Sequence, residues 1–340
     1  MFTIKRMFTD NRRVHNRWVE FLQNAKIRNE NNVDITYGLY EEEELIATGS
    51  IFQNILKCIA IHEDYRGTGA LGQLITTLVD EVFGRGYHSC YVYTKADTVE
   101  GFQYLGFKEI ARVNDELVFL ERALVGFDAY CDSLEQYRQN VNHISAIVMN
   151  ANPFTKGHQY LVEVAAKKSE WVYVFVLSED VSEFPTNVRK ELVLAGIEHL
   201  DNVTVLDTKN YMISAQTFPS YFLKEEVDVT KIQAKLDATI FAEKIAPRLN
   251  IKTRFVGEEP LSQTTSIYNE VLAETLRPTI ELRIIERKMF ADNIISATKV
   301  RELLKKGDID AVKAYVPNST YDYLLSEEGK VLIEKIRKGG

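Results

Sequence analysis

Short apolar runs alternate with helix-forming segments through the second half of this chain, and this alternation limits the possible folds more than any other feature. The first run, His143–Met149, is rich in β-branched residues and has the length of a buried parallel strand. The helix pattern at 158–168 places its apolar side chains on one side. The same patterns predict a helix at 186–199 and strands at 171–177, 203–206, 253–256 and 281–285. Such an alternation predicts a parallel sheet with right-handed crossovers.

The first third of the chain has an α/β pattern of its own. Residues 35–39, 45–52 and 55–61 are predicted strands, and an acidic turn separates the first two. A glycine-rich loop follows, and the apolar residues of 71–82 then recur at spacings of three and four, which predicts a helix that ends near Gly84–Gly86. We therefore expect an α/β protein with an α+β domain at 1–130, a linker at 131–142 and a parallel-sheet domain at 143–340.

Charge and cysteine content exclude several classes of function. With 49 acidic and 41 basic residues, the formal net charge of −8 gives no general attraction to nucleic acid or anionic lipid. Cys58, Cys90 and Cys131 form no metal-binding spacing, so we expect reduced thiols, no protein metal site and a cytoplasmic location. No apolar run approaches the roughly 20 residues of a membrane span. The sequence thus predicts neither a nucleic-acid partner nor a membrane partner.

The glycine-rich loop, Tyr65–Gly72, is the first candidate ligand-binding feature. It can present successive backbone N–H groups beside a helix N-terminus, an arrangement that suits a pyrophosphate. A strand predicted at Cys90–Thr94 and the segment Phe102–Phe107 follow it. In this order the loop resembles the RGxGxG/A loop of GNAT acetyltransferases, which binds the pyrophosphate of coenzyme A ahead of a YxxLGF element.

This resemblance implies that Arg66, Gly67 and Gly69 contact the pyrophosphate of a coenzyme-A-like arm. Leu71 departs from the pattern, which usually has a small residue there, and its bulk could narrow the approach of a phosphate. Catalysis of acetyl transfer, binding of the arm without catalysis and a purely structural role therefore all stay open for this domain.

Two distant motifs mark the second domain. The loop Asn150–His158 opens the helix after the first predicted strand, and Ile295–Arg301 opens another helix about 140 residues later, which Gly307 terminates. Histidine, lysine and arginine beside helix N-termini can stabilise charge on phosphate oxygens. Together the motifs resemble the HxGH and ISSTxxR signatures of the nucleotidylyltransferase superfamily. That resemblance implies a Rossmann-like parallel-sheet domain in which both helix N-termini converge on the triphosphate of ATP.

The superfamily resemblance also implies a role for individual residues. It makes His158, Thr155 and Lys299 the candidate catalytic residues, with Thr155 standing where the superfamily has its first histidine. The candidate ATP-binding residues that it implies are Asn152, Pro153, Phe154, Gly157, Arg189, Ser296, Thr298 and Arg301. Serine and threonine are also ordinary N-cap residues, and the arginine in the 186–199 helix could equally lie on a solvated face. Lys156 occupies a variable position of the motif.

Residues 143–325 narrow the resemblance to one family through NPFTKGHQYLVEVAA, FVLSEDVSEFP, Phe218–Lys224, Arg254–Pro260 and ISATKVRELL. These stretches resemble the citrate lyase ligases, which also carry a GNAT-like N-terminal domain. The resemblance implies an ATP-dependent ligase that converts acetate to acetyl-adenylate and acetylates the prosthetic-group thiol on the acyl carrier subunit of citrate lyase, releasing AMP and pyrophosphate. Mg²⁺ is expected with the nucleotide. The sequence does not indicate the oligomeric state.

Two groups of residues fit more than one interpretation: the aromatic residues Phe218, Tyr221 and Phe222, and the acidic residues Glu258 and Glu259. The aromatic group is typical of a core, whereas the acidic pair follows a predicted strand, where nucleotide contact is also plausible. Two rival functions stay open as well. One is acetyl-CoA-dependent transfer by the GNAT-like domain beside a domain that only binds nucleotide, and the other is a non-catalytic nucleotide-sensing adaptor.

Overall fold

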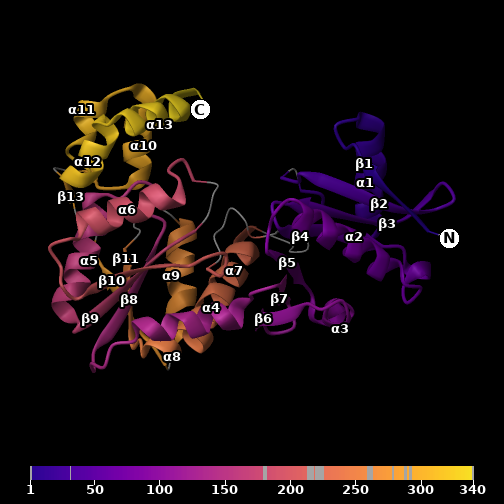
Figure 1. The fold of residues 1–340 in the computed structure, drawn as a ribbon, viewed down its shortest axis with the longest axis horizontal. Helices are drawn as coiled ribbons and strands as arrows, with labels where there is room; N and C mark the ends of the chain where they lie inside the picture. The colour runs from indigo at the N-terminus through magenta and orange to yellow at the C-terminus, as the bar shows by residue number, and fades with distance from the viewer. Residues whose placement is uncertain are drawn as a thin grey trace. The chain divides into compact units, whose positions relative to one another are not determined.

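The chain forms two compact units (Figure 1). The first comprises residues 1–133 and 217–239, and the second comprises residues 134–216 and 240–340. The segment 217–239, which the sequence analysis placed in the second domain, is thus grouped with the first unit. The computed structural model describes residues 2–30, 32–178, 182–212, 218, 226–258, 263–277, 279–286, 289–290 and 293–338. Within these ranges, no helix combines the length and the apolar character that crossing a bilayer requires.

A mixed seven-stranded sheet forms the first unit, in the order β1-β2-β3-β4-β5-β7-β6. Neighbouring strands are antiparallel except β4 and β5, which run parallel and pair only at Ile55–Tyr91 and Leu56–Val92. The strands are β1 (Thr3–Met7), β2 (Ile35–Glu41), β3 (Glu44–Phe52), β4 (Ile55–Ile61), β5 (Ser89–Thr94), β6 (Lys108–Val113) and β7 (Leu117–Ala123). The helices are α1 (Arg12–Asn24), α2 (Ala70–Gly84), α3 (Val99–Tyr104), α4 (Phe127–Leu134) and α7 (Glu226–Ile240), of which α4 and α7 each extend one residue into the second unit.

The order of elements that supports the GNAT resemblance is confirmed: β4, the glycine-rich loop, α2, β5 and then the Phe102–Phe107 segment. Helix α2 packs on the sheet through its buried apolar side, as its three-and-four spacing predicts. Strand β1 was not predicted from the sequence, because only one of its five side chains is buried and its apolar and polar residues do not alternate. In the returning segment, the buried Phe218 meets Tyr93 edge to face at 5.6 Å between ring centroids. This places Phe218 in a core, as its aromatic character indicates.

The predicted parallel sheet of the second unit is confirmed, with strand order β10-β9-β8-β11-β12 and every pair parallel. Its strands are β8 (Ile144–Met149), β9 (Trp171–Val176), β10 (Val203–Asp207), β11 (Thr253–Gly257) and β12 (Glu281–Ile285). A two-stranded ribbon is formed by β13 (Met289–Phe290) and β14 (Asn293–Ile294). Along the chain, β9 and β10 are added on one side of β8, and β11 and β12 are then added on its other side. The strand order therefore reverses between β8 and β11.

Helices cover both faces of this sheet, and its central strands β8 and β9 are buried along almost their whole length. From β9, Val172, Val174 and Val176 join the core under α5 (Lys156–Lys168) and α6 (Thr186–Gly196). On the opposite face Phe175 contacts Phe241 of the π-helical turn Phe241–Ile245. The C-terminal helices, drawn in yellow in Figure 1, pack on one another, and the helix Asn318–Leu325 among them contacts α6. The remaining helices are α8 (Ala246–Leu249), α9 (Gln263–Leu276), α10 (Ala297–Lys306), α11 (Ile309–Val312), α12 (Asn318–Leu325) and α13 (Glu327–Lys338).

Candidate functional site

The first motif lies where the strand order of the parallel sheet reverses. Strand β8 ends at Met149, and the loop that follows leads into α5 at the carboxyl edge of the sheet. Open parallel sheets bind ligands at this position, because the loops after two neighbouring strands diverge there and leave a crevice. The loop includes the cis peptide bond between Asn152 and Pro153. The topology thus identifies this loop as the candidate binding region.

Helix α5 begins with a reciprocal cap between Thr155 and His158. The Thr155 hydroxyl accepts from the backbone N–H of His158 at 3.3 Å, and the backbone N–H of Thr155 donates to His158 Nδ1 at 3.1 Å. The Thr155 Oγ1 and His158 Nδ1 atoms lie 3.0 Å apart, and the imidazole stacks on Phe154. Thr155 is only 1% exposed. The structure therefore directs the Thr155 hydroxyl to His158 and argues against the direct catalytic contact that the sequence analysis expected.

Gly157 brings the two motifs together. A Cβ atom at this position would lie 3.1 Å from the backbone oxygen of Ile295, the residue that precedes the N-cap of α10. That distance is shorter than an ordinary carbon–oxygen contact, so a side chain at 157 would push the two backbones apart. The glycine thus lets the backbone of the second motif approach the start of α5 closely. Motifs separated by about 140 residues meet at one place.

The start of α10 supplies the second group of candidates. Ser296 is the N-cap, and its hydroxyl accepts from the backbone N–H of Lys299 at 3.2 Å. Thr298 is exposed and Lys299 is half-buried. Among the residues that the structure describes, no acidic side chain forms an ion pair with Lys299. A cation in the first helical turn opposes the helix dipole, and a bound anion would offset that unfavourable placement.

Arg301 links the two motifs through a polar network that the sequence did not predict. Its Nη1 donates to the backbone oxygen of Asn152 at 2.6 Å, and its Nε lies 3.3 Å from Glu183 Oε1. The Asn152 amide donates to Glu183 Oε2 at 2.7 Å and accepts from the backbone N–H of Phe184. Burial raises the pKa of Glu183, but the Asn152 hydrogen bond and the charges of Arg301 and Lys305 outweigh it and leave that pKa below its ordinary value. Glu183 is therefore ionised at neutral pH.

Glu183 was not among the site residues predicted from the sequence, although its position carries a signal. It follows β9, whose carboxyl end lies on the same edge of the sheet as the end of β8. Two further acids, Glu179 and Asp180, share this loop in the sequence. Sequence position alone therefore could not select Glu183 from the three.

Arg189 has a structural role rather than the expected contact with nucleotide phosphates. It is fully buried in α6, where its guanidinium donates to the backbone oxygens of Phe184, Asn150 and Leu177 at 3.0, 2.8 and 2.6 Å. It also bonds to the Asn150 side chain and to Thr186. These bonds fix the loops after β8 and β9 to each other. The arginine thus supports the candidate site from beneath, and neither a phosphate contact nor a solvated face fits its burial.

Three further motif residues also have structural contacts. Pro153 and Phe154 are buried, and the Phe154 ring fills the space above Gly196, where a Cβ atom would collide with it. The backbone oxygen of Phe154 accepts from the Thr320 hydroxyl at 3.0 Å. Lys156 donates to the backbone oxygens of residues 313 and 314 at 2.9 and 3.1 Å. These contacts anchor the loop to the C-terminal helices, so Pro153 and Phe154 shape the site and expose little surface to a ligand.

The acidic pair after β11 is only partly described. The backbone N–H of Glu258 donates to the backbone oxygen of Ile285 at 2.8 Å, which places it at the carboxyl edge of the sheet. Glu259, Tyr221 and Phe222 lie outside the described residues. Within the described ranges, no group of three or more histidine, cysteine or acidic side chains is arranged to hold a metal ion.

The glycine-rich loop of the first unit is open. Gly67 and Gly69 have φ angles of +79° and +88°, and a Cβ atom at either position would meet nothing within 4 Å. Gly69 is the N-cap of α2 and provides no side-chain cap. Leu71 points toward Gly101 of α3, where its Cδ2 would be 2.9 Å from a Cβ atom. The leucine that departs from the GNAT pattern is thus packed against a neighbouring helix.

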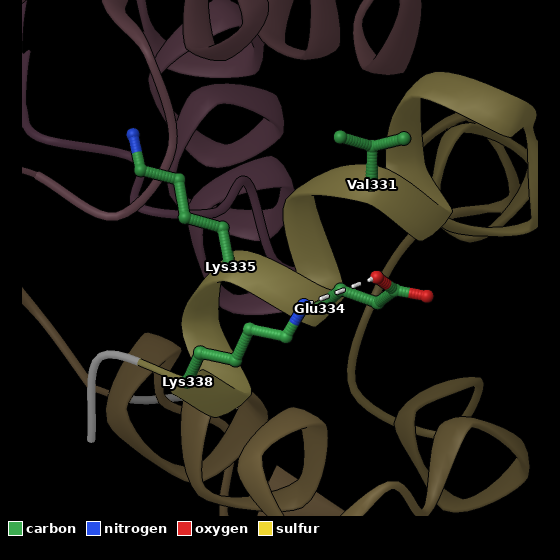
Figure 2. Close-up of a pocket in the computed structure, with 4 residues that line it drawn as sticks. All are labelled: Val331, Glu334, Lys335 and Lys338. Carbon is green, nitrogen blue, oxygen red and sulfur yellow. Dashed lines mark ion pairs between the residues drawn. The ribbon is translucent and has the colours of Figure 1, made fainter.

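A surface hollow outside the motifs is no rival site. Figure 2 shows that Val331, Glu334, Lys335 and Lys338 line it, all from α13. Glu334 and Lys338 form an ion pair one helical turn apart at 3.7 Å. Side chains on a single exposed helix face cannot enclose a ligand, so the motif region stays the candidate site.

Known proteins similar to this chain match it across both units. Residues 144–324 match the family model of the citrate lyase ligase C-terminal domain. The citrate (pro-3S)-lyase ligase of Escherichia coli (strain K12) is 37% identical over 311 residues, which cover 90% of this chain and 88% of that protein. The ligase of the same name from Klebsiella pneumoniae is 37% identical over 310 residues, 90% and 91% of the two chains.

Among solved structures, TmcAL of Thermotoga maritima, bound with alpha-thio ATP, is similar over 56% of this chain and 57% of that one, with 14% identity and a TM-score of 0.37. The family matches cover both motifs of the second unit and most of the first unit. They confirm the resemblance seen in the sequence, and the chain belongs to the citrate lyase ligase family.

Proposed function

We propose that this chain is an ATP-dependent ligase that activates acetate as acetyl-adenylate and passes the acetyl group to the prosthetic-group thiol on the acyl carrier subunit of citrate lyase. A carboxylate oxygen of acetate attacks the α-phosphorus of ATP and pyrophosphate leaves. The carrier thiol then attacks the acetyl carbon and AMP leaves. The observation that carries the proposal is the meeting of the α5 and α10 N-termini at Gly157 and Ile295, on the edge of the sheet where its strand order reverses.

The residues at this meeting point fit a triphosphate. Two helix N-termini provide positive potential and backbone donors, and His158, Lys299 and Arg301 add a hydrogen-bond donor and two cations. Thr298 and Ser296 supply hydroxyls on the first turn of α10. The reaction needs no protein nucleophile, because the chain only has to align acetate with the phosphorus and stabilise charge on the phosphate oxygens.

Each of these three side chains then has a distinct task. His158 donates a hydrogen bond to an oxygen of the reacting phosphate, while Lys299 and Arg301 bind the β- and γ-phosphates of the departing pyrophosphate. Mg²⁺ bound with the nucleotide would offset charge on its phosphate oxygens. The backbone oxygen of Asn152 and the carboxylate of Glu183 both contact the Arg301 guanidinium and hold it in position. The Asn152 side chain in turn donates a hydrogen bond to Glu183. Gly157 keeps the two helix starts close enough to act on one nucleotide.

For the first unit we propose that the Gly67–Gly69 loop binds the coenzyme-A-derived arm of the carrier. The left-handed glycines and the bare N-terminus of α2 leave backbone donors open to a pyrophosphate or phosphate, and Arg66 is exposed beside them. The packing of Leu71 against α3 leaves this approach unobstructed by that side chain. Acetyl transfer by this unit itself is not required.

The test is incubation of the chain with ATP, Mg²⁺, acetate and the thiol-bearing acyl carrier subunit, without acetyl-CoA. We expect pyrophosphate and AMP to form and the mass of the carrier to increase by one acetyl group. Replacing ATP by acetyl-CoA separates the rivals, because only a GNAT-type acetyltransferase acetylates under that condition. A carrier that stays unmodified with ATP and acetate contradicts the proposal.

A further inference from the structure

One nitrogen of His158 faces a group that can only donate. The backbone N–H of Thr155 lies 3.1 Å from His158 Nδ1, and a backbone N–H has no acceptor capacity. A proton on Nδ1 would point at the amide proton, so this backbone contact favours an accepting Nδ1. In a neutral imidazole with an accepting Nδ1, the proton resides on Nε2.

The Thr155 hydroxyl strengthens the same arrangement. Its oxygen already accepts from the backbone N–H of His158 at 3.3 Å, so its own proton is available to Nδ1, 3.0 Å away. The backbone N–H and the hydroxyl of Thr155 thus share the lone pair of Nδ1. The Phe154 ring, stacked on the imidazole at 5.8 Å between centroids, restricts its rotation. Thr155 is buried, which keeps water from competing for these bonds.

We propose that Thr155 is a positioning residue that fixes His158 in the Nε2–H tautomer, so that Nε2 is the atom that donates to a phosphate oxygen of ATP. This inference rests on the proposed function for the identity of the acceptor. It gives a task to the threonine that stands where the nucleotidylyltransferase pattern has a histidine. The residue acts through its neighbour and does not touch the nucleotide.

The tautomer can be observed directly in the full chain. In ¹⁵N-histidine-labelled protein, long-range ¹H–¹⁵N correlation spectra distinguish a protonated from an unprotonated ring nitrogen, and His158→Gln identifies the resonances of His158 among the six histidines. We expect an unprotonated Nδ1 and a protonated Nε2 at neutral pH. Addition of ATP with Mg²⁺ should shift the Nε2 resonance more than the Nδ1 resonance. A protonated Nδ1 in the parent protein overturns the inference.

Two substitutions separate positioning from simple capping. Thr155→Val removes the hydroxyl at almost constant volume, and we expect a mixture of tautomers and about a tenfold lower rate of acetate-dependent ATP–pyrophosphate exchange, an effect typical of losing an orienting partner. Thr155→Ser should restore both the tautomer and most of the rate. Asn11→Ala is the matched control, since Asn11 caps α1 through the backbone N–H groups of residues 13 and 14. It should lower thermal stability by a similar amount and leave exchange unchanged.

The outcomes distinguish this inference from the proposed function. If Thr155→Val keeps a pure Nε2–H tautomer and the parent exchange rate, Thr155 is only a cap and the inference is wrong. If the parent protein shows no exchange at all, the proposed function fails, and the tautomer spectra still decide whether Thr155 orients His158.

Discussion

Two strand–loop–helix turns in this chain, one in each unit, use glycine for opposite reasons. At the start of α2, Gly67 and Gly69 adopt left-handed conformations and face open space. At the start of α5, Gly157 has an ordinary helical conformation, and the backbone of Ile295 occupies the space that a side chain would need. The first turn needs glycine for its backbone conformation, and the second needs it for room.

The same contrast extends to the helix caps. The N-terminus of α2 has no side-chain cap, whereas Thr155 and His158 cap α5 reciprocally. Lys156 also anchors α5 through hydrogen bonds to the backbone oxygens of residues 313 and 314. A pre-organised site is expected where charge develops during a reaction, because its dipoles need not reorganise. An open loop is sufficient for holding an extended arm. The difference therefore suits catalysis in the second unit and binding in the first.

The largest expected effect tests the capped turn. We expect His158→Ala to lower acetate-dependent ATP–pyrophosphate exchange by about 100-fold or more, comparable to the loss of one pre-organised donor. Thermal stability should change little beyond the loss of the cap, which is worth about 1 kcal/mol. His199→Ala, which alters an exposed histidine on the same unit, is the control. Normal exchange by His158→Ala would show that the motif assignment is wrong.

Arg301→Ala should raise the KM for ATP about 30-fold, because a charged hydrogen bond to phosphate contributes roughly 2 kcal/mol. The KM for acetate should stay nearly unchanged, since the guanidinium acts on the phosphates. Initial rates with each substrate varied in turn provide the measurement. A change confined to the acetate KM would require a new assignment of the roles.

Gly157→Ala and Gly69→Ala test the two uses of glycine against each other. The first should displace α10 and lower exchange about tenfold, because small misplacements of a reacting group are costly. The second should cost roughly 1–2 kcal/mol of stability through backbone strain and leave exchange unchanged. Thermal denaturation and exchange assays on both variants provide the comparison. Equal exchange rates in the two variants would remove the distinction.

Arg66→Ala combined with Gly69→Val tests the open loop. Carrier acetylation should slow a few-fold, while ATP–pyrophosphate exchange continues at the parent rate, because the arm binds in a step after adenylation. Arg13→Ala, at the exposed start of α1, is the control for a lost surface arginine. If the double variant acetylates the carrier as fast as the parent, the first unit has a structural role.

The smallest expected effect concerns the pH dependence of stability through Glu183. The pKa of Glu183 is lowered in the folded state, so the stability that it contributes is present above the ordinary glutamate pKa and is lost as the pH falls through the folded pKa. Glu183→Gln should therefore lower the Tm at pH 7, and the difference from the parent should shrink in acid. Glu334→Gln on the exposed face of α13 should show no such trend.

The sequence predicted the parts of the fold that depend on regular patterns. The alternation of strands and helices predicted β8, β9 and α5 to within about two residues, and the two motifs predicted the helix starts at which the site forms. Individual roles were harder to predict, because a residue's role depends on what reaches it in three dimensions. Arg189 is buried because three carbonyl groups converge on it, and Glu183 belongs to the site because Asn152 and Arg301 bind it.

The grouping of 217–239 with the first unit also affects how the protein is made. After residue 133, a ribosome synthesises about eighty residues of the second unit before it synthesises the segment 217–239, which contains most of α7 and belongs to the first unit. At roughly 5–20 residues per second, the nascent first unit lacks this helix for several seconds. Strands β8, β9 and β10 emerge during that interval, ahead of β11 and β12. Neither unit can therefore be completed from one uninterrupted stretch of translation, and their folding is interleaved in time.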